Sequence, residues 1–312
     1  MLLPSLVLAI GAPLASAKIV GSAFLPHGDF AFDPSLVSFE NGSQALHDAG
    51  VVVGSHIVDL APDIILISTP HGESEDVNFL FLDATRAHAK ATIGLDLDQD
   101  CGDGCYTATL PVDHVKIAKN VTLETVEVLR SRGFRVASLS AFADTEPAPL
   151  RWGELIPLSF LNQTLNRTEL VVMGQPTRRY TEEVAMVPEL LSLGGAIFDM
   201  YDRMDARVVV LISGDLAHTH LASGPYGYSA AASPFDAAMG AWAEGLQDAP
   251  LLDDATDLSD AAKSCGFTGA VMLHGLLNAS ASEGKRVHPR LLARAAPTYY
   301  GMMVAEFAAT TA

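Results

Sequence analysis

The sequence predicts a single α/β domain with a largely parallel or mixed central sheet flanked by helices. Short apolar runs typical of buried strands alternate along the chain with segments of helical periodicity. A length of 312 residues suits one large α/β domain or two small ones. No linker, internal repeat or low-complexity tract divides the chain. We therefore expect one domain over residues 18–312.

The predicted elements follow one another along this domain. Strands are expected at 18–25, 63–69, 134–139, 169–174 and 207–213, and helices at 121–132, 182–204, 235–246, 258–263 and 270–277. Gly133 provides the stop signal after the first of these helices. The helix at 182–204 is expected to be interrupted near Pro188 and again at Gly194–Gly195. The runs 290–294 and 299–305 close the chain.

Composition limits the classes of function. Apolar residues make up 49% of the chain and charged residues only 18%, which indicates a well-formed core. The formal net charge of −18 disfavours binding to nucleic acid and to anionic membrane surfaces, because their phosphates would be repelled. We expect neither as a partner.

The first seventeen residues resemble a cleavable secretion signal. This apolar stretch, 1–17, ends in Ala15-Ser16-Ala17, the small-x-small form of a signal-peptidase site, although it lacks a positively charged start. It is too short, and too broken by Pro4 and Pro13, to span a membrane stably. The sequence thus favours the secretory pathway or the extracellular space, with the cytoplasm as the alternative.

Asparagine usage supports this location. The chain has six asparagines, and five of them begin an Asn-x-Ser/Thr acceptor for N-glycosylation: Asn41, Asn120, Asn162, Asn166 and Asn278.

Three cysteines are present. Cys101 and Cys105 are close enough to form a disulfide across a Gly-rich loop in an oxidising compartment. Cys265 then has no cysteine partner, and it is either a buried apolar thiol or a functional group.

Histidines follow three of the predicted strands. The tripeptides Pro26-His27-Gly28 and Pro70-His71-Gly72 each end an apolar run, and the run 207–218 ends at His218. Because the carboxyl ends of parallel strands meet at one edge of a sheet, the three histidines could converge there. Imidazole is a common metal ligand and proton shuttle, so this convergence is the strongest functional hint in the sequence. A lone histidine at a strand end is more often structural. His220 could share the pocket or point to solvent, and we expect the remaining histidines to be structural or surface residues.

Other motifs are weaker or missing. The segment Asp96-x-Asp98-x-Asp100 resembles the start of a calcium loop, but Cys101 and Thr107 stand where glycine and glutamate belong. Signatures of nucleotide binding and of serine hydrolases are missing from the sequence.

Taken in order, several blocks resemble the class III extradiol dioxygenases, specifically the LigB-like catalytic subunit and its relative, the Memo family. The blocks are residues 24–28, 68–72, 213–218, 224–229 with Phe235-Asp236, and 264–267. Each is short, but their order and separation are distinctive.

The resemblance implies a mononuclear non-haem Fe(II) enzyme that cleaves a catechol-type aromatic diol with O2. In this reading His27 and His71 are metal ligands, and His218 is the acid/base that takes the diol proton. Some members work with a second subunit and others as single chains, so the oligomeric state stays open.

The third metal ligand departs from the ring-cleaving pattern. Those enzymes mostly use glutamate near the C-terminus, whereas this chain has Cys265, as Memo relatives do. A thiolate ligand would favour copper or zinc, and Glu73 and Asp29 are conceivable alternatives. Trp152 stands where many relatives carry a histidine. Two further functions therefore stay open: a Memo-like, non-enzymatic metal-binding or redox protein, and another metal-dependent reaction such as hydrolysis.

Overall fold

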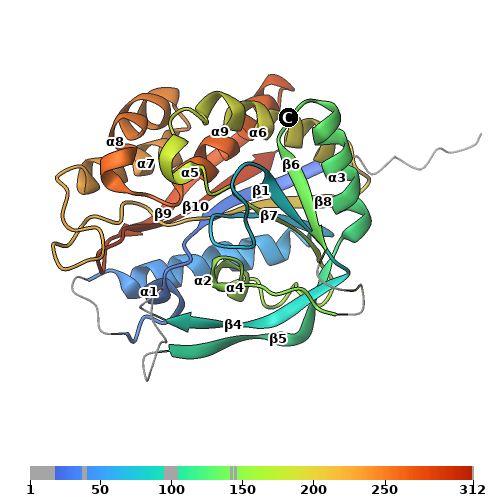
Figure 1. Ribbon diagram of the computed structural model, residues 1–312, viewed down its shortest axis with the longest axis horizontal. Coiled ribbons are helices and arrows are strands. Elements are labelled where there is room, and N and C mark those ends of the chain that lie inside the picture. The colour runs from blue at the N-terminus through green and yellow to red at the C-terminus, as the bar shows by residue number, and fades with distance from the viewer. Residues whose placement is uncertain (1–17, 37–40, 95–104, 141–142, 144–145, 311–312) are drawn as a thin grey trace, which may run out of the picture.

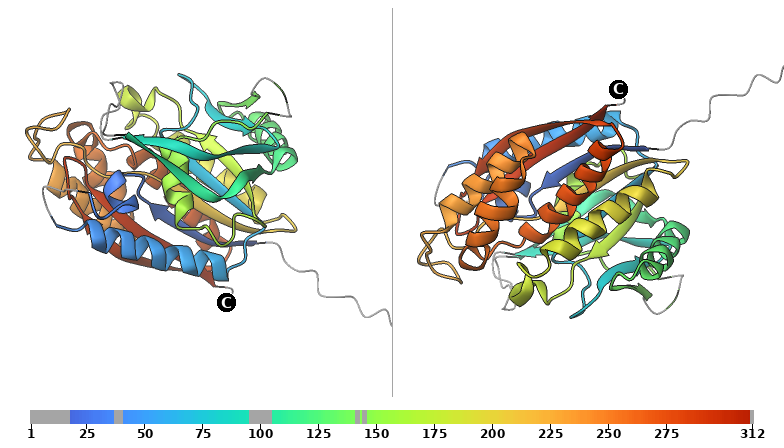
Figure 2. Two further views of the ribbon diagram at one scale, coloured as in Figure 1. Left: turned by 90° about the horizontal axis from the view of Figure 1, so that it is seen from below. Right: turned by 90° about the horizontal axis from the view of Figure 1, so that it is seen from above.

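The computed structural model describes residues 18–36, 41–94, 105–140, 143 and 146–310. In these residues a mixed ten-stranded sheet crosses the molecule, and helices cover both of its faces (Figures 1 and 2). This arrangement confirms the predicted α/β class. None of the helices in these ranges is both long enough and apolar enough to cross a membrane.

Four parallel strands form the centre of the sheet. In spatial order they are β7 (Glu169–Gly174), β2 (Ile64–Thr69), β8 (Arg207–Ser213) and β1 (Lys18–Leu25). Every residue of β2 is buried, because packing covers both faces of a central parallel strand. The continuous apolar runs in the sequence predicted all four strands.

Further strands extend both sides of this centre. On one side β10 (Met302–Thr310) pairs with β1 and with the edge strand β9 (Arg286–Ala295). On the other side β5 (Cys105–Ile117) runs parallel to β7 and antiparallel to β4 (Arg86–Gly94). The first pair contains the two runs that close the chain, whereas the sequence did not predict β4 and β5.

A short branch leaves the main order of strands at β7. It consists of β3 (Phe79–Asp83), antiparallel to β7, and β6 (Val136–Ser140), parallel to β3. The predicted strand at 134–139 corresponds to β6, and β3 was not predicted.

The helices divide between two hydrophobic cores, one on each face of the sheet. The first face carries α3 (Lys119–Ser131), α6 (Val187–Tyr201), α7 (Ala232–Gly245), η2 (Ala249–Ala255), α8 (Thr256–Ala262) and α9 (Phe267–Ser282), and α5 (Arg179–Glu182) precedes α6. The second face carries α1 (Asp29–Phe32), α2 (Ser43–Asp59) and α4 (Trp152–Ser159).

One of the two interruptions expected in the helix at 182–204 is confirmed. Helix α5 ends at Glu182 and α6 begins at Val187, so the break lies just before Pro188. The second expected interruption is wrong, because α6 continues through Gly194 and Gly195. Pro188 lies in the first turn, where its missing N–H costs no hydrogen bond. Gly194 faces α9, where a Cβ atom would overlap the carbonyl oxygen of Met272. This glycine therefore permits close helix packing instead of ending the helix.

Candidate metal centre

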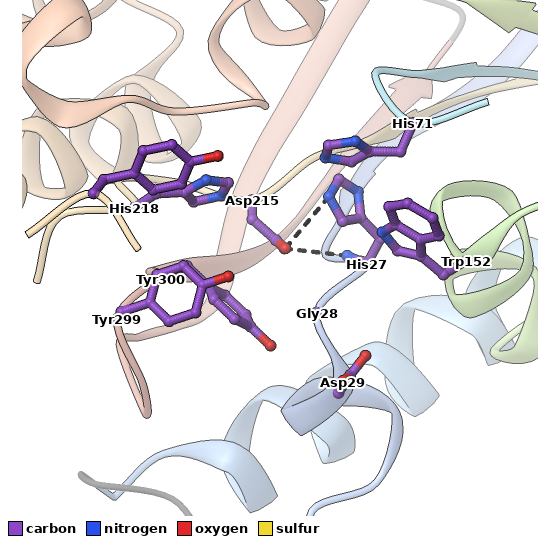
Figure 3. A pocket seen from close by; sticks show the side chains of 10 residues that line it. His27, Gly28, Asp29, His71, Trp152, Asp215, His218, Tyr299 and Tyr300 are labelled. Carbon is purple, nitrogen blue, oxygen red and sulfur yellow. Dashed lines mark hydrogen bonds and ion pairs between the residues drawn. The ribbon is translucent and has the colours of Figure 1, made fainter. Parts of the chain in front are cut away.

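The three predicted histidines meet at one edge of the sheet. His27 follows β1, His71 follows β2, and His218 comes shortly after β8, so the parallel strands carry them to the same place (Figure 3). They line a cavity with about 560 Å³ of empty space, partly open to solvent. Asp215, Trp152 and three tyrosines complete its wall.

Three potential ligand atoms cluster beside this cavity. The ligand atoms of His27, His71 and Cys265 all lie within 4.8 Å of one another. The Cys265 Sγ is 3.3 Å from the His27 Nε2, and the two imidazole rings stand edge to face with centroids 4.8 Å apart. A second group, Asp215, His218 and Cys265, meets the same distance limit and shares the thiol. The chain thus brings together the three residues that the sequence suggested as metal ligands.

The glycines of the two Pro-His-Gly tripeptides are needed for this packing. A Cβ atom at Gly28 would overlap the ring of Tyr300, and one at Gly72 would overlap the Glu154 carboxylate. Only glycine allows these neighbours so close to the backbone beside each histidine.

A hydrogen-bond chain determines the tautomer of His27. The Ser213 hydroxyl donates its one hydrogen to the carbonyl oxygen of Gly153. It must therefore accept from the His27 Nδ1, which lies 2.9 Å away and carries the ring proton. The Nε2 lone pair then points toward Cys265. In metal-binding histidines, a hydrogen bond from the other ring nitrogen commonly determines the tautomer and the ring orientation in this way.

Burial keeps the histidines neutral. It lowers the pKa of His27 to about 3 and that of His218 to about 4, with smaller contributions from nearby positive groups such as Arg179. Burial also moves the pKa of His71 well below its ordinary range. At neutral pH all three imidazoles are unprotonated, which is the form that binds metals.

The acidic groups beside them are protonated in the metal-free protein. Burial raises the pKa of Asp215 to about 8 and that of the Cys265 thiol to about 12. The 3.4 Å contact between His27 Nε2 and Asp215 Oδ2 therefore joins two neutral groups and is not an ion pair. A metal ion would favour the thiolate and the carboxylate, so this donor set suits a cation.

His218 offers an unused ring nitrogen. Its Nε2 is buried and has no hydrogen-bond partner, while the ring stacks on Tyr226 with centroids 5.9 Å apart and meets Tyr300 edge-on. Its backbone N–H donates to the carbonyl oxygen of Ala262 at 2.8 Å. A buried polar atom without a partner on a fixed loop is available to a ligand.

The same loop is held by a buried carboxyl group. Asp236 Oδ1 accepts from the Ala217 N–H at 2.9 Å, and its Oδ2 lies 2.8 Å from the His220 Nε2. His220 therefore supports the loop that carries His218.

The alternative third ligands lie outside the cluster. Glu73 forms an ion pair with Arg151 at 3.2 Å, and Asp29 lines the cavity from α1 without joining either ligand group. Trp152 stacks on the His71 ring with centroids 5.2 Å apart.

Sequence reasoning missed Asp215, Tyr226, Tyr299 and Tyr300. Asp215 had a usable signal, since a carboxylate directly after a buried strand requires a partner or a function. Tyr226 lies within block 224–229 of the family resemblance, whereas Tyr299 and Tyr300 had no such signal, because their position depends on distant parts of the chain.

The remaining candidate residues lie elsewhere. Residues 1–17 and Cys101 fall outside the described ranges, and the candidate Cys101–Cys105 disulfide with them. The five sequon asparagines are exposed: Asn41, Asn120, Asn162, Asn166 and Asn278.

Comparisons with known proteins agree with the fold and show the family. The model of a family described as the catalytic LigB subunit of aromatic ring-opening dioxygenase matches residues 35–298, and the chain belongs to this family. The fold is similar to that of an uncharacterized protein, JW3007, from Escherichia coli K12. That similarity has a TM-score of 0.54 at 12% identity and covers 92% of this chain and 99% of that one, and it concerns the fold alone. The chain matches no curated protein.

Proposed function

We propose that the protein is a non-haem Fe(II)-dependent dioxygenase that opens the ring of a catechol-type aromatic diol with O2. Membership of the family supports dioxygenase chemistry in general. The observation that carries the proposal is the meeting of His27, His71 and Cys265 beside a cavity that also contains the unpartnered Nε2 of His218.

Each residue has a distinct part in this reaction. His27, His71 and Cys265 would hold the iron, which supplies a Lewis-acid centre where diol and O2 meet. His218 is neutral at pH 7, and in the tautomer with its proton on Nδ1 its Nε2 can accept a proton from a diol hydroxyl and later return it. Trp152 and Tyr300 wall the cavity and limit the water around the reacting ring.

The thiol supports a second candidate function, a Memo-like non-enzymatic metal-binding or redox protein. The Cys265 Sγ lies 3.3 Å from His27 Nε2, which suits a shared metal. Thiolate is a soft ligand that favours Cu(I) or Zn(II) over Fe(II).

Metal content and oxygen uptake separate the two functions. Protein purified without oxygen is reconstituted with competing Fe(II), Cu(I) and Zn(II), analysed for bound metal, and assayed with a panel of catechols. About one iron per chain, with oxygen uptake and a coloured ring-fission product, supports the dioxygenase. Copper or zinc that is lost in Cys265→Ser, without turnover, supports the Memo-like function. His27→Ala should lose metal under either function, whereas the surface variant His56→Gln is the matched control that should retain it.

We also propose that the protein enters the secretory pathway and is N-glycosylated. The exposure of all five sequon asparagines is compatible with attached glycans and supports this location.

A further inference from the structure

Two exposed histidines face each other on the strands β4 and β5, which lie at the bottom of the molecule in Figure 1. His88 of β4 and His114 of β5 are directly opposed in the antiparallel ladder. Their neighbours Ala87 and Val115 are fully buried in the second core, so the alternation of a strand turns both imidazoles toward solvent. Neither histidine belongs to the cavity or to the ligand groups of the candidate metal centre. A ligand bound by this pair would therefore be separate from that centre.

The two histidines form the kind of cross-strand pair in which side chains approach most closely. The His88 N–H donates to the carbonyl oxygen of Ala148 at 2.8 Å, on the side of β4 that faces away from β5. His88 and His114 therefore exchange no backbone hydrogen bonds, and the Cα atoms of such a pair are about 4.5 Å apart. The two rings have their centroids 6.3 Å apart and their planes inclined by 37°. The backbone thus presents two imidazoles side by side.

Both rings are available to a ligand. Among the described residues, the structure gives the side chains of His88 and His114 no hydrogen bond and no ion pair. His56 differs, because it is also exposed but lies 2.8 Å from a carboxylate oxygen of Glu306. Bonds of about 2.0–2.1 Å from one metal ion to both rings would place the ring centroids about 5–6 Å apart. Small rotations of two exposed side chains are enough to reach this distance.

The surroundings of the pair determine which ion it suits. Arg86 and Lys116 form the next opposed pair on the same face, and Lys90 follows His88 on that face. Within the described ranges no carboxylate or thiol joins the two histidines in a ligand group. Hard cations such as Mg²⁺ and Ca²⁺ require oxygen ligands and would also be repelled here. Imidazole suits transition metals, and Cu(II) binds nitrogen ligands most strongly among the divalent ions of the first row.

We propose that His88 and His114 form a surface site for a divalent transition-metal ion, and that Cu(II) binds there most strongly. One nitrogen of each ring would hold the ion, and water would fill its other coordination positions. The ion would also join β4 to β5 where their pairing becomes irregular, because residues 110–113 of β5 stand opposite Ala89 alone. This site does not depend on the proposed dioxygenase function.

The test uses copper(II) iminodiacetate as its probe. This chelate leaves the ion few open positions and is too bulky for the buried cluster, where His27 is only 3% exposed. It therefore reports exposed histidine pairs. In calorimetric titrations of the full chain, we expect the unmodified protein to bind at least about tenfold more tightly than His88→Gln or His114→Gln, because each variant keeps a single imidazole. His56→Gln is the matched control, since it removes an exposed histidine outside the pair and should leave the affinity unchanged.

Three results would overturn the site. The first is no binding of the chelate by the unmodified protein, and the second is an affinity that stays unchanged in either His88→Gln or His114→Gln. The third comes from electron paramagnetic resonance of the unmodified protein, which does not depend on any variant folding. Nitrogen couplings to the copper distinguish two bound imidazoles, which support the site, from one, which overturns it. None of these measurements involves iron or oxygen, so their outcome leaves the dioxygenase proposal unchanged.

Discussion

The hydroxyl of Ser213 determines which ring nitrogen of His27 carries the proton, although it is not one of the candidate metal ligands. It receives the Nδ1 proton because its own hydrogen is used by the Gly153 carbonyl. Loss of a hydrogen-bond partner that orients a metal ligand typically weakens metal binding 10–100-fold.

We therefore predict that Ser213→Ala lowers metal affinity by about 10–100-fold while the protein stays folded. Competition with a chromophoric chelator measures the affinity. Ser68→Ala is the control, because Ser68 is equally buried in β2 but bonds to Gln175 instead of a histidine. Unchanged affinity in the Ser213 variant would show that the tautomer is determined in another way.

Glu154 makes stability depend on pH. This carboxyl group accepts from the Arg151 N–H at 2.8 Å, and burial raises its pKa from 4.5 to about 7. The folded protein therefore prefers the protonated acid, and this stabilisation is fully present below pH 4.5 and lost as pH rises through 7. At about 1.4 kcal/mol per pKa unit, the change is about 3 kcal/mol.

Glu154→Gln keeps the acceptor but cannot ionise. We predict that the variant gains about 3 kcal/mol of stability relative to the native protein between pH 4.5 and pH 8. Denaturant unfolding of both proteins across this range measures the difference. A difference that does not change with pH would contradict the prediction.

Among the elements, helix α6 has two neighbouring glycines, Gly194 and Gly195, that differ in how closely they approach α9. A methyl group on Gly194 would overlap the α9 backbone, whereas the nearest atom to a methyl on Gly195, the Ala279 Cβ, is 4.0 Å away. We predict that Gly194→Ala destabilises the protein by about 1–3 kcal/mol through overpacking. Gly195→Ala should stabilise it by about 1 kcal/mol, since alanine is the better helix former. Thermal unfolding tests both, and a loss of stability in Gly195→Ala would contradict this account.

The elements differ in how far the sequence predicted them. The central strands were predictable because burial on both faces requires continuous apolar runs. In β4 the buried residues Ala87, Ala89 and Ala91 alternate with exposed ones, and alanine is a weak strand former, so the signal was small. Helix α2 was missed because valines and glycines fill its middle, and both types have low helix propensity.

The residues of the candidate site also differ in how far the sequence predicted them. His27, His71 and His218 could be predicted because parallel strands carry their carboxyl ends to one edge. Tyr299 and Tyr300 precede an antiparallel strand, and their place depends on the insertion of β10 between β1 and β9. Arg179 has no local signal, because its hydrogen bond to the Pro70 carbonyl oxygen joins distant parts of the chain.

For the whole molecule, the five sequons bear on when glycosylation would occur relative to folding. The serine and threonine residues of these sequons are buried in the fold, and the hydroxyls of Thr164 and Thr168 bond to each other at 2.7 Å. Glycans would therefore have to be attached before folding is complete.

We predict that the full chain, expressed in a eukaryotic secretory host, loses mass on treatment with an endoglycosidase. Asn162→Gln should remove one glycan, whereas Asn78→Gln, which alters the one asparagine outside a sequon, should change nothing. A secreted protein whose mass does not change would contradict the prediction.

The pairing of β1 with β10 joins opposite ends of the described chain. His27 follows the first of these strands, and Tyr300 comes just before the other. While the chain is still emerging from the ribosome, β1 lacks one of its two neighbours and the cavity lacks part of its wall. Contacts between such distant segments form slowly. A metal ion bound beside this cavity would therefore meet a complete wall only after the last strand has paired, late in folding.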